Sequence, residues 1–231
     1  MFFDPMYFII VGPAILLSMY AQYKVKSTYK NFSKVAALSG MTGSEVAREL
    51  LDSNGLSGIG VEQVKGELTD HYDPKSKVLR LSQGIYNGSS LSALGIAAHE
   101  AGHALQDHAG YVPMKIRAGL VPSASLGTKL GPILIIIGFI FMSGSTLGDG
   151  VIQLGIVFFA AAVLFQIVTL PVEFDASKRA ITLLSDGGYI KNNEYSATKK
   201  VLNAAALTYL AAALAAITQL LYFILLSQRR R

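Results

Sequence analysis

The sequence predicts a mainly helical membrane protein with a small β element. Hydrophobic residues make up 52% of the 231 residues and charged residues only 15%, whereas soluble domains average about a quarter charged. The mean hydropathy is +0.43, and several long apolar runs alternate with polar segments. We therefore expect about four transmembrane helices attached to one polar domain.

The first apolar run covers residues 6–21, with Asp4 before it and Lys24 after it. A cleaved signal peptide carries its positive charge ahead of the apolar run, whereas this segment carries it behind. Residues 1–23 are therefore predicted to form an N-terminal transmembrane anchor with its N-terminus outside.

Residues 24–130 have the composition of a polar domain. Thr42 and Glu45 form a capping-box pattern that predicts the start of an amphipathic helix, and Asn54 marks its end. Residues 61–64 and 77–82 are predicted to be short strands.

A polar turn is expected at residues 70–74, before the second of these strands, because Pro74 disfavours helical geometry at Asp73. The strand that follows leads toward the central helix of the chain. An edge strand beside a cleft can hold an extended peptide by backbone hydrogen bonds.

Residues 91–104 contain His99-Glu100-Ala101-Gly102-His103, which fits the pattern H-E-x-x-H. On a helix, His99 and His103 lie one above the other on the same face, where two imidazoles can bind one ion. Glu100 is placed to act as a general base toward water beside that ion. Three serines are candidates for the helix cap: Ser89, Ser90 and Ser92.

A five-residue pattern also occurs by chance, and a lone histidine in an apolar helix is usually a core residue. Here two of the 4 histidines fall in the pattern, in an otherwise uncharged helix. Burying an unpaired glutamate there would cost several kcal/mol without a compensating cation, so a metal site is favoured. The chain has no cysteine, so the ligands must be histidine and carboxylate.

Three other residues, His71, Tyr86 and Asn87, are weaker candidates for the cleft. His71 either binds substrate or an oxyanion, or bonds to its neighbours in a turn. Tyr86 and Asn87 precede the metal helix and are candidates to line the cleft. His108 is off the ligand face by helical spacing and is interpreted as a surface residue.

Residues 131–170 are predicted to form a two-span hairpin, with a tight turn at residues 148–150, which read Gly-Asp-Gly. The preceding residues 113–130 contain Pro122 and several charges. They are expected to lie along the membrane surface or to form a broken helix.

The third ligand is sought in residues 171–200, because a catalytic zinc ion needs three protein ligands and an open position. Glu173 and Asp175 follow an uncharged span, where two acidic side chains are energetically unfavourable unless they have a function. The alternative is that they pair with Lys178 and Arg179. Residues 201–231 are predicted to form a hydrophobic helix with a basic tail.

Several motifs together resemble the bacterial YugP-like membrane zinc metallopeptidases and, more distantly, the HtpX-like and CAAX-prenyl-type membrane proteases. The resemblance runs from about Thr42 to Lys200. It is carried by His99-Glu100-Ala101-Gly102-His103, Asp70-His71-Tyr72-Asp73-Pro74, Leu79-Arg80-Leu81-Ser82, Tyr86-Asn87-Gly88 and Glu173-Phe174-Asp175-Ala176.

This resemblance implies a zincin-like catalytic domain with a gluzincin-like site. His99, His103 and Glu173 would hold one Zn²⁺ per chain, and Glu100 would be the catalytic base. Ser177 stands where the distant relatives carry aspartate, so the role of that acid is absent or is taken by another group such as Asp175, a possible outer partner of the site.

We therefore expect a membrane-embedded zinc endopeptidase that hydrolyses membrane-associated or misfolded proteins. The alternative from another class is a membrane scaffold with a structural metal, which a fourth protein ligand such as His71 or Asp175 would favour. A transporter is a weaker alternative, because the apolar runs carry almost no charge.

The net charge of +5 is spread among the loops beside apolar segments, which favours a lipid bilayer over nucleic acid as partner. We expect a multi-pass protein of the bacterial cell (inner) membrane with the active site on the cytoplasmic side. The tail at residues 229–231 conflicts with this topology, because a fourth span would place three arginines outside.

Overall fold

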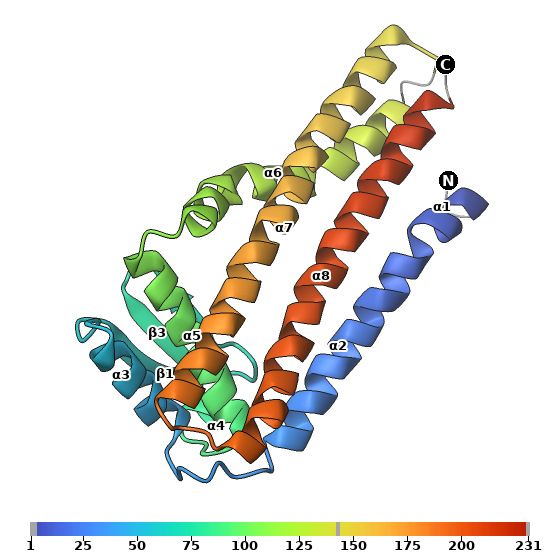
Figure 1. Cartoon of the computed structure of the whole chain (residues 1–231). Helices are drawn as coiled ribbons and strands as arrows, with labels where there is room; N and C mark the ends of the chain where they lie inside the picture. The colour runs from blue at the N-terminus through green and yellow to red at the C-terminus, as the bar shows by residue number, and fades with distance from the viewer. Residues whose placement is uncertain (1–3, 142–143, 230–231) are drawn as a thin grey trace. The chain divides into compact units, whose positions relative to one another are not determined.

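The structure is a computed structural model that describes residues 4–141 and 144–229. Residues 1–3 of the predicted anchor and residues 230–231 of the predicted basic tail lie outside the described residues. Figure 1 shows the elements in chain order: α1 Pro5–Ile10, α2 Gly12–Phe32, α3 Gly43–Ser53, β1 Gly60–Val64, β2 His71–Asp73, β3 Val78–Ser82, α4 Gln83–Tyr86, α5 Leu91–His108, α6 Val112–Ile140, α7 Thr146–Asp186 and α8 Asn192–Gln228. The prediction of a mainly helical chain with a small sheet is confirmed.

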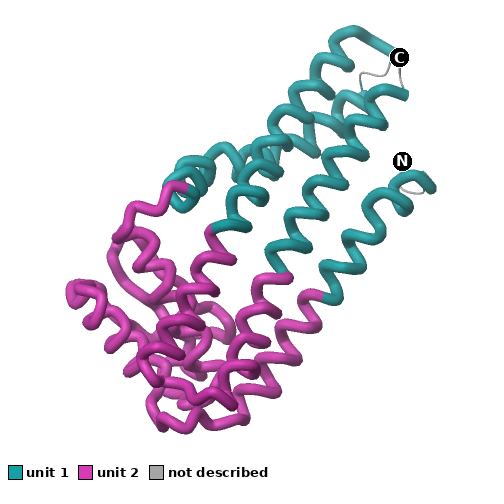
Figure 2. The backbone as a smooth tube through the Cα atoms, viewed as in Figure 1, with its two compact units in different colours: residues 1–20, 113–171, 208–231 teal, residues 21–112, 172–207 magenta. Residues whose placement is uncertain are grey.

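The chain forms two compact units, which Figure 2 shows in different colours. One unit, here called the apolar unit, contains residues 1–20, 113–171 and 208–231. The other, here called the polar unit, contains residues 21–112 and 172–207. The helices α2, α7 and α8 each contribute residues to both units.

Three helices in the described part of the chain are long and apolar enough to cross a membrane: α6, α7 and α8. The expected fourth span, within residues 1–23, is not among them. Its residues are divided between α1 and α2, with Val11 between the two helices, and the second half of α2 carries Lys24, Lys26 and Lys30. These charges lower the hydropathy of α2 below that of a membrane span.

The predicted turn at residues 148–150 is wrong, because all three residues belong to α7. The connection between α6 and α7 instead falls at residues 141–145, of which 142–143 lie outside the described residues. Residues 113–130 belong to one helix, α6, which holds both Pro122 and Pro132 within its length. Proline is tolerated inside apolar helices when neighbouring groups satisfy the freed carbonyls.

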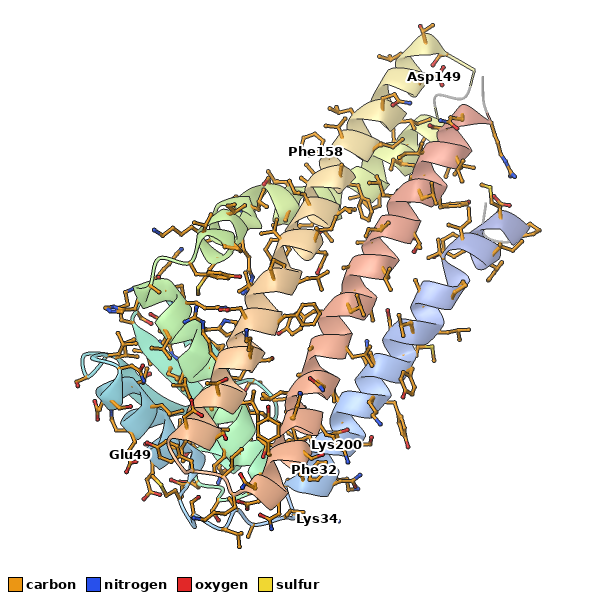
Figure 3. All side chains as sticks on the ribbon, viewed as in Figure 1. Phe32, Lys34, Glu49, Asp149, Phe158 and Lys200 are labelled. Atoms are coloured by element: carbon orange, nitrogen blue, oxygen red, sulfur yellow. The ribbon has the colours of Figure 1, made fainter. Side chains whose placement is uncertain are left out.

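Glycines allow α6 and α7 to pack closely within the apolar unit. A β-carbon at Gly131 would lie 2.9 Å from the Phe159 β-carbon, and one at Gly155 would lie 2.8 Å from the Gly131 carbonyl oxygen. A β-carbon at Gly127 would overlap the carbonyl oxygen of Phe158, which is labelled on α7 in Figure 3. Small residues in this position are typical of helix contacts in membranes, where close backbone packing replaces the hydrophobic driving force.

Beside these glycines, the apolar unit contains a small buried aliphatic cluster made by Ile135, Ile152 and Ile156. Partly buried side chains from α6 and α8 pack against it: Phe139, Leu220, Phe223 and Ile224. Van der Waals contacts of this cluster therefore stabilise the close packing of α6 against α7.

The three strands of the polar unit are ordered β1-β3-β2, with β1 parallel and β2 antiparallel to β3. The strand β2 occupies part of the predicted turn at residues 70–74. The turn prediction gave too much weight to Pro74, which in fact lies just after the strand. Alternation along the strand buries Tyr72 to 8% exposure, opposite Leu79 in the register, and leaves His71 exposed.

The start of β2 is held by Asp70, whose carboxylate accepts hydrogen bonds from the Ser82 backbone N–H (2.7 Å) and hydroxyl (3.0 Å). Burial raises the pKa of Asp70 above its ordinary value, although the bonds from Ser82 oppose this shift. These bonds fix β2 beside the end of β3.

The helices α3 and α5 form the core of the polar unit with β3. The capping box of α3 is confirmed, because Thr42 Oγ1 accepts from the Glu45 N–H while Glu45 accepts from the Thr42 N–H. The largest buried side chains of this core come from α3, β3 and α5: Leu50, Leu51, Leu79, Leu81, Leu91 and Leu94. The core supports α5 along its length.

We predict that Gly127→Ala destabilises the apolar unit. The added β-carbon overlaps backbone of α7, and overpacking of this kind costs about 1–3 kcal/mol. Gly119→Ala is the matched control on the same helix, because a β-carbon there meets nothing within 4 Å. At an open helical position the same change is worth about 0.5–1 kcal/mol of stabilisation. Thermal unfolding in detergent should therefore shift down for the first variant and not for the second. Equal shifts would refute the close packing.

Candidate metal centre

The helix α5 buries the H-E-x-x-H residues because its flanking turns are almost entirely small and apolar. Ser90 caps the helix by accepting a hydrogen bond from the Ala93 N–H at 3.2 Å. His99, Glu100 and His103 are 9%, 8% and 8% exposed. Polar side chains this deeply buried need hydrogen-bond partners, and these come from α7, from β2 and, for His103, from Gln106 on α5 itself.

Glu173 approaches the two histidines from α7 and is only 1% exposed. The helix α7 continues through Pro171 to Asp186. The segment predicted as a separate third-ligand helix, residues 171–200, is therefore the last part of α7, a turn and the first part of α8. Glu173 is rigidly placed because it lies within a continuous helix.

The geometry of the three side chains fits a tetrahedral metal site. The Glu173 Oε2 atom lies 3.3 Å from His99 Nε2 and 3.5 Å from His103 Nε2. Ligand atoms about 2.0–2.1 Å from a tetrahedral zinc ion are separated from one another by about 3.3–3.4 Å. One ligand atom from each residue lies within 4.8 Å of the others. Two imidazoles and a carboxylate are also a donor set that zinc accepts.

Glu100 lies beside this group of three and is held by strand β2. Its Oε2 atom accepts a hydrogen bond from the Tyr72 backbone N–H at 3.0 Å. Nothing in the sequence marks Tyr72 as a site residue, because the composition of residues 70–74 is typical of a turn. Its main chain restricts the rotamers of Glu100.

Tyr72 also ties β2 to the end of α5 through its side chain. Its hydroxyl donates to Asp107 Oδ2 at 2.8 Å, and Lys77 Nζ lies 2.5 Å from the same oxygen. Burial, followed by the hydrogen bond and charge of Asp107, raises the pKa of Tyr72 above its ordinary value. The hydroxyl therefore stays protonated and keeps its donor role at neutral pH.

The outward nitrogens of the two imidazoles have partners as well. His99 Nδ1 lies 3.2 Å from the Ser177 hydroxyl, and His103 Nδ1 lies 3.0 Å from Gln106 Oε1. Ser177 thus contacts a histidine of the group directly. Burial lowers the pKa of His103, but the hydrogen bond to Glu173 and the charges of Glu100 and Glu173 raise it above its ordinary value overall.

Asp175 reaches the site only indirectly. Its Oδ2 atom accepts from Gln106 Nε2 at 2.8 Å and from Arg179 Nε at 2.6 Å. The predicted pairing with arginine is therefore present, together with a contact to a residue that touches His103. Gln106 was missed by the sequence analysis, although a fully buried amide three residues after a ligand histidine lies on the same helix face.

The remaining candidates are not members of the described metal group of His99, His103 and Glu173. His71 is exposed, and its Nδ1 atom lies 2.8 Å from the Thr69 carbonyl oxygen, as the turn alternative expects. Asn87 donates to Gln63 and borders a hollow of about 570 Å³, while Tyr86 borders another of about 380 Å³. His108 is exposed at the end of α5. Neither hollow is lined by the His99, His103 and Glu173 group.

Comparison with known proteins agrees with this geometry. Residues 7–228 match the family described as "Putative neutral zinc metallopeptidase". The chain belongs to this zinc metallopeptidase family. It is similar to the "Putative membrane protease YugP" of Bacillus subtilis (strain 168), with 48% identity over 223 residues, or 96% of each chain. No solved structure matches the chain.

The helices α5 and α7 come close together at Gly102, the glycine of the H-E-x-x-H motif. A β-carbon at Gly102 would lie 2.9 Å from the Ala176 carbonyl oxygen and 3.4 Å from the Ala176 α-carbon. Gly102 and Ala176 follow Glu100 and Glu173 on their respective helices. Their contact therefore sets the distance between the histidine pair and the carboxylate.

We predict that Gly102→Ala weakens metal binding. The added methyl group pushes α5 away from α7 at a cost of about 1–3 kcal/mol, which corresponds to a loss of affinity of about 5–150-fold if it falls on the bound state. Zinc affinity can be measured by competition with a chelating dye. Gly58→Ala in the polar unit is the control, because a β-carbon there meets nothing within 4 Å. Unchanged affinity in Gly102→Ala would show that this contact does not set the site.

Proposed function

We propose that this protein is a membrane-bound zinc endopeptidase with a gluzincin-like site, in which His99, His103 and Glu173 hold one Zn²⁺ and Glu100 is the general base. The observation that carries the proposal is the spacing of the three buried ligand atoms, with separations of 3.3 and 3.5 Å from the carboxylate oxygen to the two imidazoles. Membership of the zinc metallopeptidase family supports the same chemistry.

When bound, zinc polarises a carbonyl oxygen and lowers the pKa of water. Glu100 lies next to His99 in the chain, and the Tyr72 N–H holds one of its carboxylate oxygens at 3.0 Å. Its other oxygen accepts the proton of the attacking water and returns it to the leaving amine. The burial of Glu100 to 8% exposure favours proton transfer, because bulk water does not compete.

The alternative of a scaffold with a structural metal requires a fourth protein ligand. In the described part of the chain, the group that can hold a metal contains three side chains. The two fourth ligands considered from the sequence are engaged elsewhere, His71 with the Thr69 carbonyl and Asp175 with Gln106 and Arg179. Three protein ligands, as in catalytic zinc sites, would leave a fourth position for water or substrate and support the enzyme.

The proposed substrates are polypeptide segments at a membrane surface, including misfolded membrane proteins. Glu173 belongs to the same continuous helix as one of the three candidate spans, α7. The basic residues gather in the polar segments outside the apolar runs, which supports a multi-pass protein of the bacterial cell membrane with the site on the cytoplasmic side.

We predict that Glu100→Gln keeps zinc and loses peptidase activity. The amide preserves the size of the side chain and can still accept from Tyr72, but it cannot take a proton from water. Loss of a general base costs about 10²–10⁴-fold in rate. The assay is cleavage of casein by the purified protein in detergent, together with metal analysis. Retained turnover with bound zinc would refute the role of Glu100.

Glu173→Gln separates the ligand role from the base role. We expect this variant to lose zinc and activity together, because a neutral amide is a much weaker zinc ligand than a carboxylate. Glu67→Gln, an exposed change on the loop before β2, is the control and should keep both. Zinc retained at full stoichiometry in Glu173→Gln would remove this residue from the proposed ligand set.

A further inference from the structure

Gln106 is a fully buried amide that links His103 on its own helix to α7. It is 0% exposed and makes three hydrogen-bonding contacts. Its Oε1 atom lies 3.0 Å from His103 Nδ1, and its Nε2 atom lies 2.8 Å from the Val172 carbonyl oxygen and 2.8 Å from Asp175 Oδ2. An amide so completely surrounded has one satisfactory orientation.

The partners on α7 determine that orientation. A backbone carbonyl oxygen can only accept a hydrogen bond, so the Val172 carbonyl requires the NH₂ group of Gln106. The Asp175 oxygen contacts the same NH₂ group. Arg179 Nε, at 2.6 Å from the same Asp175 oxygen, holds this carboxylate in place.

The fixed amide in turn determines which ring nitrogen of His103 carries a hydrogen. With the NH₂ group committed to α7, Gln106 presents its carbonyl oxygen to the imidazole. This oxygen can only accept, so His103 Nδ1 must carry a proton. The other ring nitrogen, Nε2, is then the one that can bind a metal, and it is the atom 3.5 Å from Glu173 Oε2.

The second histidine lacks such a constraint. The partner of His99 Nδ1 is the hydroxyl of Ser177, at 3.2 Å. A hydroxyl can donate or accept by rotation about its C–O bond, so it accommodates either state of the ring. The two imidazoles are thus held differently, one by a rigid amide and one by an adaptable hydroxyl.

We propose that Gln106 is a positioning residue that fixes His103 as the Nδ1–H tautomer, with Val172 O and Asp175 orienting the amide, and thereby raises the zinc affinity of the site. His103 is then in the tautomer that binds zinc before the ion arrives, because the hydrogen bonds from α7 through Gln106 have already selected it. Partners of this kind are commonly worth 10–100-fold in metal affinity. The inference rests on the proposed zinc site and adds a residue that does not touch the metal.

The test compares Gln106→Met with wild type in the full chain in detergent. Methionine fills the same space without hydrogen bonds. Zinc dissociation constants are measured by dye competition, and thermal unfolding is measured on the metal-free proteins. We expect the zinc affinity of Gln106→Met to fall by about 10–100-fold. Ser177→Ala should have a smaller effect, and the exposed Gln22→Met should have none.

The outcomes separate this inference from the proposed function. If wild type itself binds no zinc, the proposed site fails and the inference fails with it. If wild type binds zinc and folded Gln106→Met binds it within twofold as well, only the inference fails. A lower unfolding temperature of the metal-free variant with unchanged zinc affinity would indicate a purely structural role and would also overturn it.

A measurement on the wild type covers the case in which Gln106→Met does not fold. Histidine labelled with ¹⁵N and loading with ¹¹³Cd allow the ligating nitrogen to be identified by its coupling to the metal. We expect coupling to His103 Nε2 and a protonated Nδ1. Coupling to Nδ1, or an unprotonated Nδ1, would overturn the inference.

Discussion

Ligands from two helices can share one metal ion only if the helix backbones come close to each other. In this protein, the closest approach of α5 and α7 recorded at the site is the contact of Gly102 with Ala176, where a β-carbon would lie 2.9 Å from a carbonyl oxygen. Because both helices are continuous through this point, the contact fixes the carboxylate of Glu173 relative to the two imidazoles. The other features of the site depend on it.

The close approach of α5 and α7 buries several polar groups, and each of them has a polar neighbour in the structure. The two imidazoles meet one carboxylate and, on their outer sides, a hydroxyl and an amide. Glu100 meets a backbone N–H of β2. Hydrogen-bonded networks of this kind lower the cost of burying polar groups and favour one geometry. The small sheet thus serves the site, because β2 brings the backbone of Tyr72 to the catalytic helix.

Much of the site could be predicted from the sequence because it follows helical periodicity. His99 and His103 are one turn apart, and Glu173 stood out as an acid directly after an uncharged run. Tyr72 and Gln106 could not be found in the same way. Tyr72 acts through its backbone, which carries no sequence signal, and the contacts of Gln106 with Val172 and Asp175 join residues distant in the sequence.

Two local features of the fold also differ from the sequence-based predictions. Gly148 and Gly150 have the composition of a turn, yet they are helical in α7. The α7 backbone at Gly148 lies against α6, where a β-carbon at Gly138 would lie 2.9 Å from the Gly148 carbonyl oxygen. Pro74 suggested a turn where a three-residue strand precedes it. For the strand, the deciding contact is its pairing with β3, which local propensities do not include.

The central claim is that one divalent ion joins α5 to α7 through two imidazoles and a carboxylate. The most direct measurement is X-ray absorption at the zinc edge of the purified, zinc-loaded protein. The account predicts a four-coordinate shell of nitrogen and oxygen at about 2.0–2.1 Å, with multiple scattering from two imidazole rings. A six-coordinate shell of oxygen without imidazole scattering would contradict it.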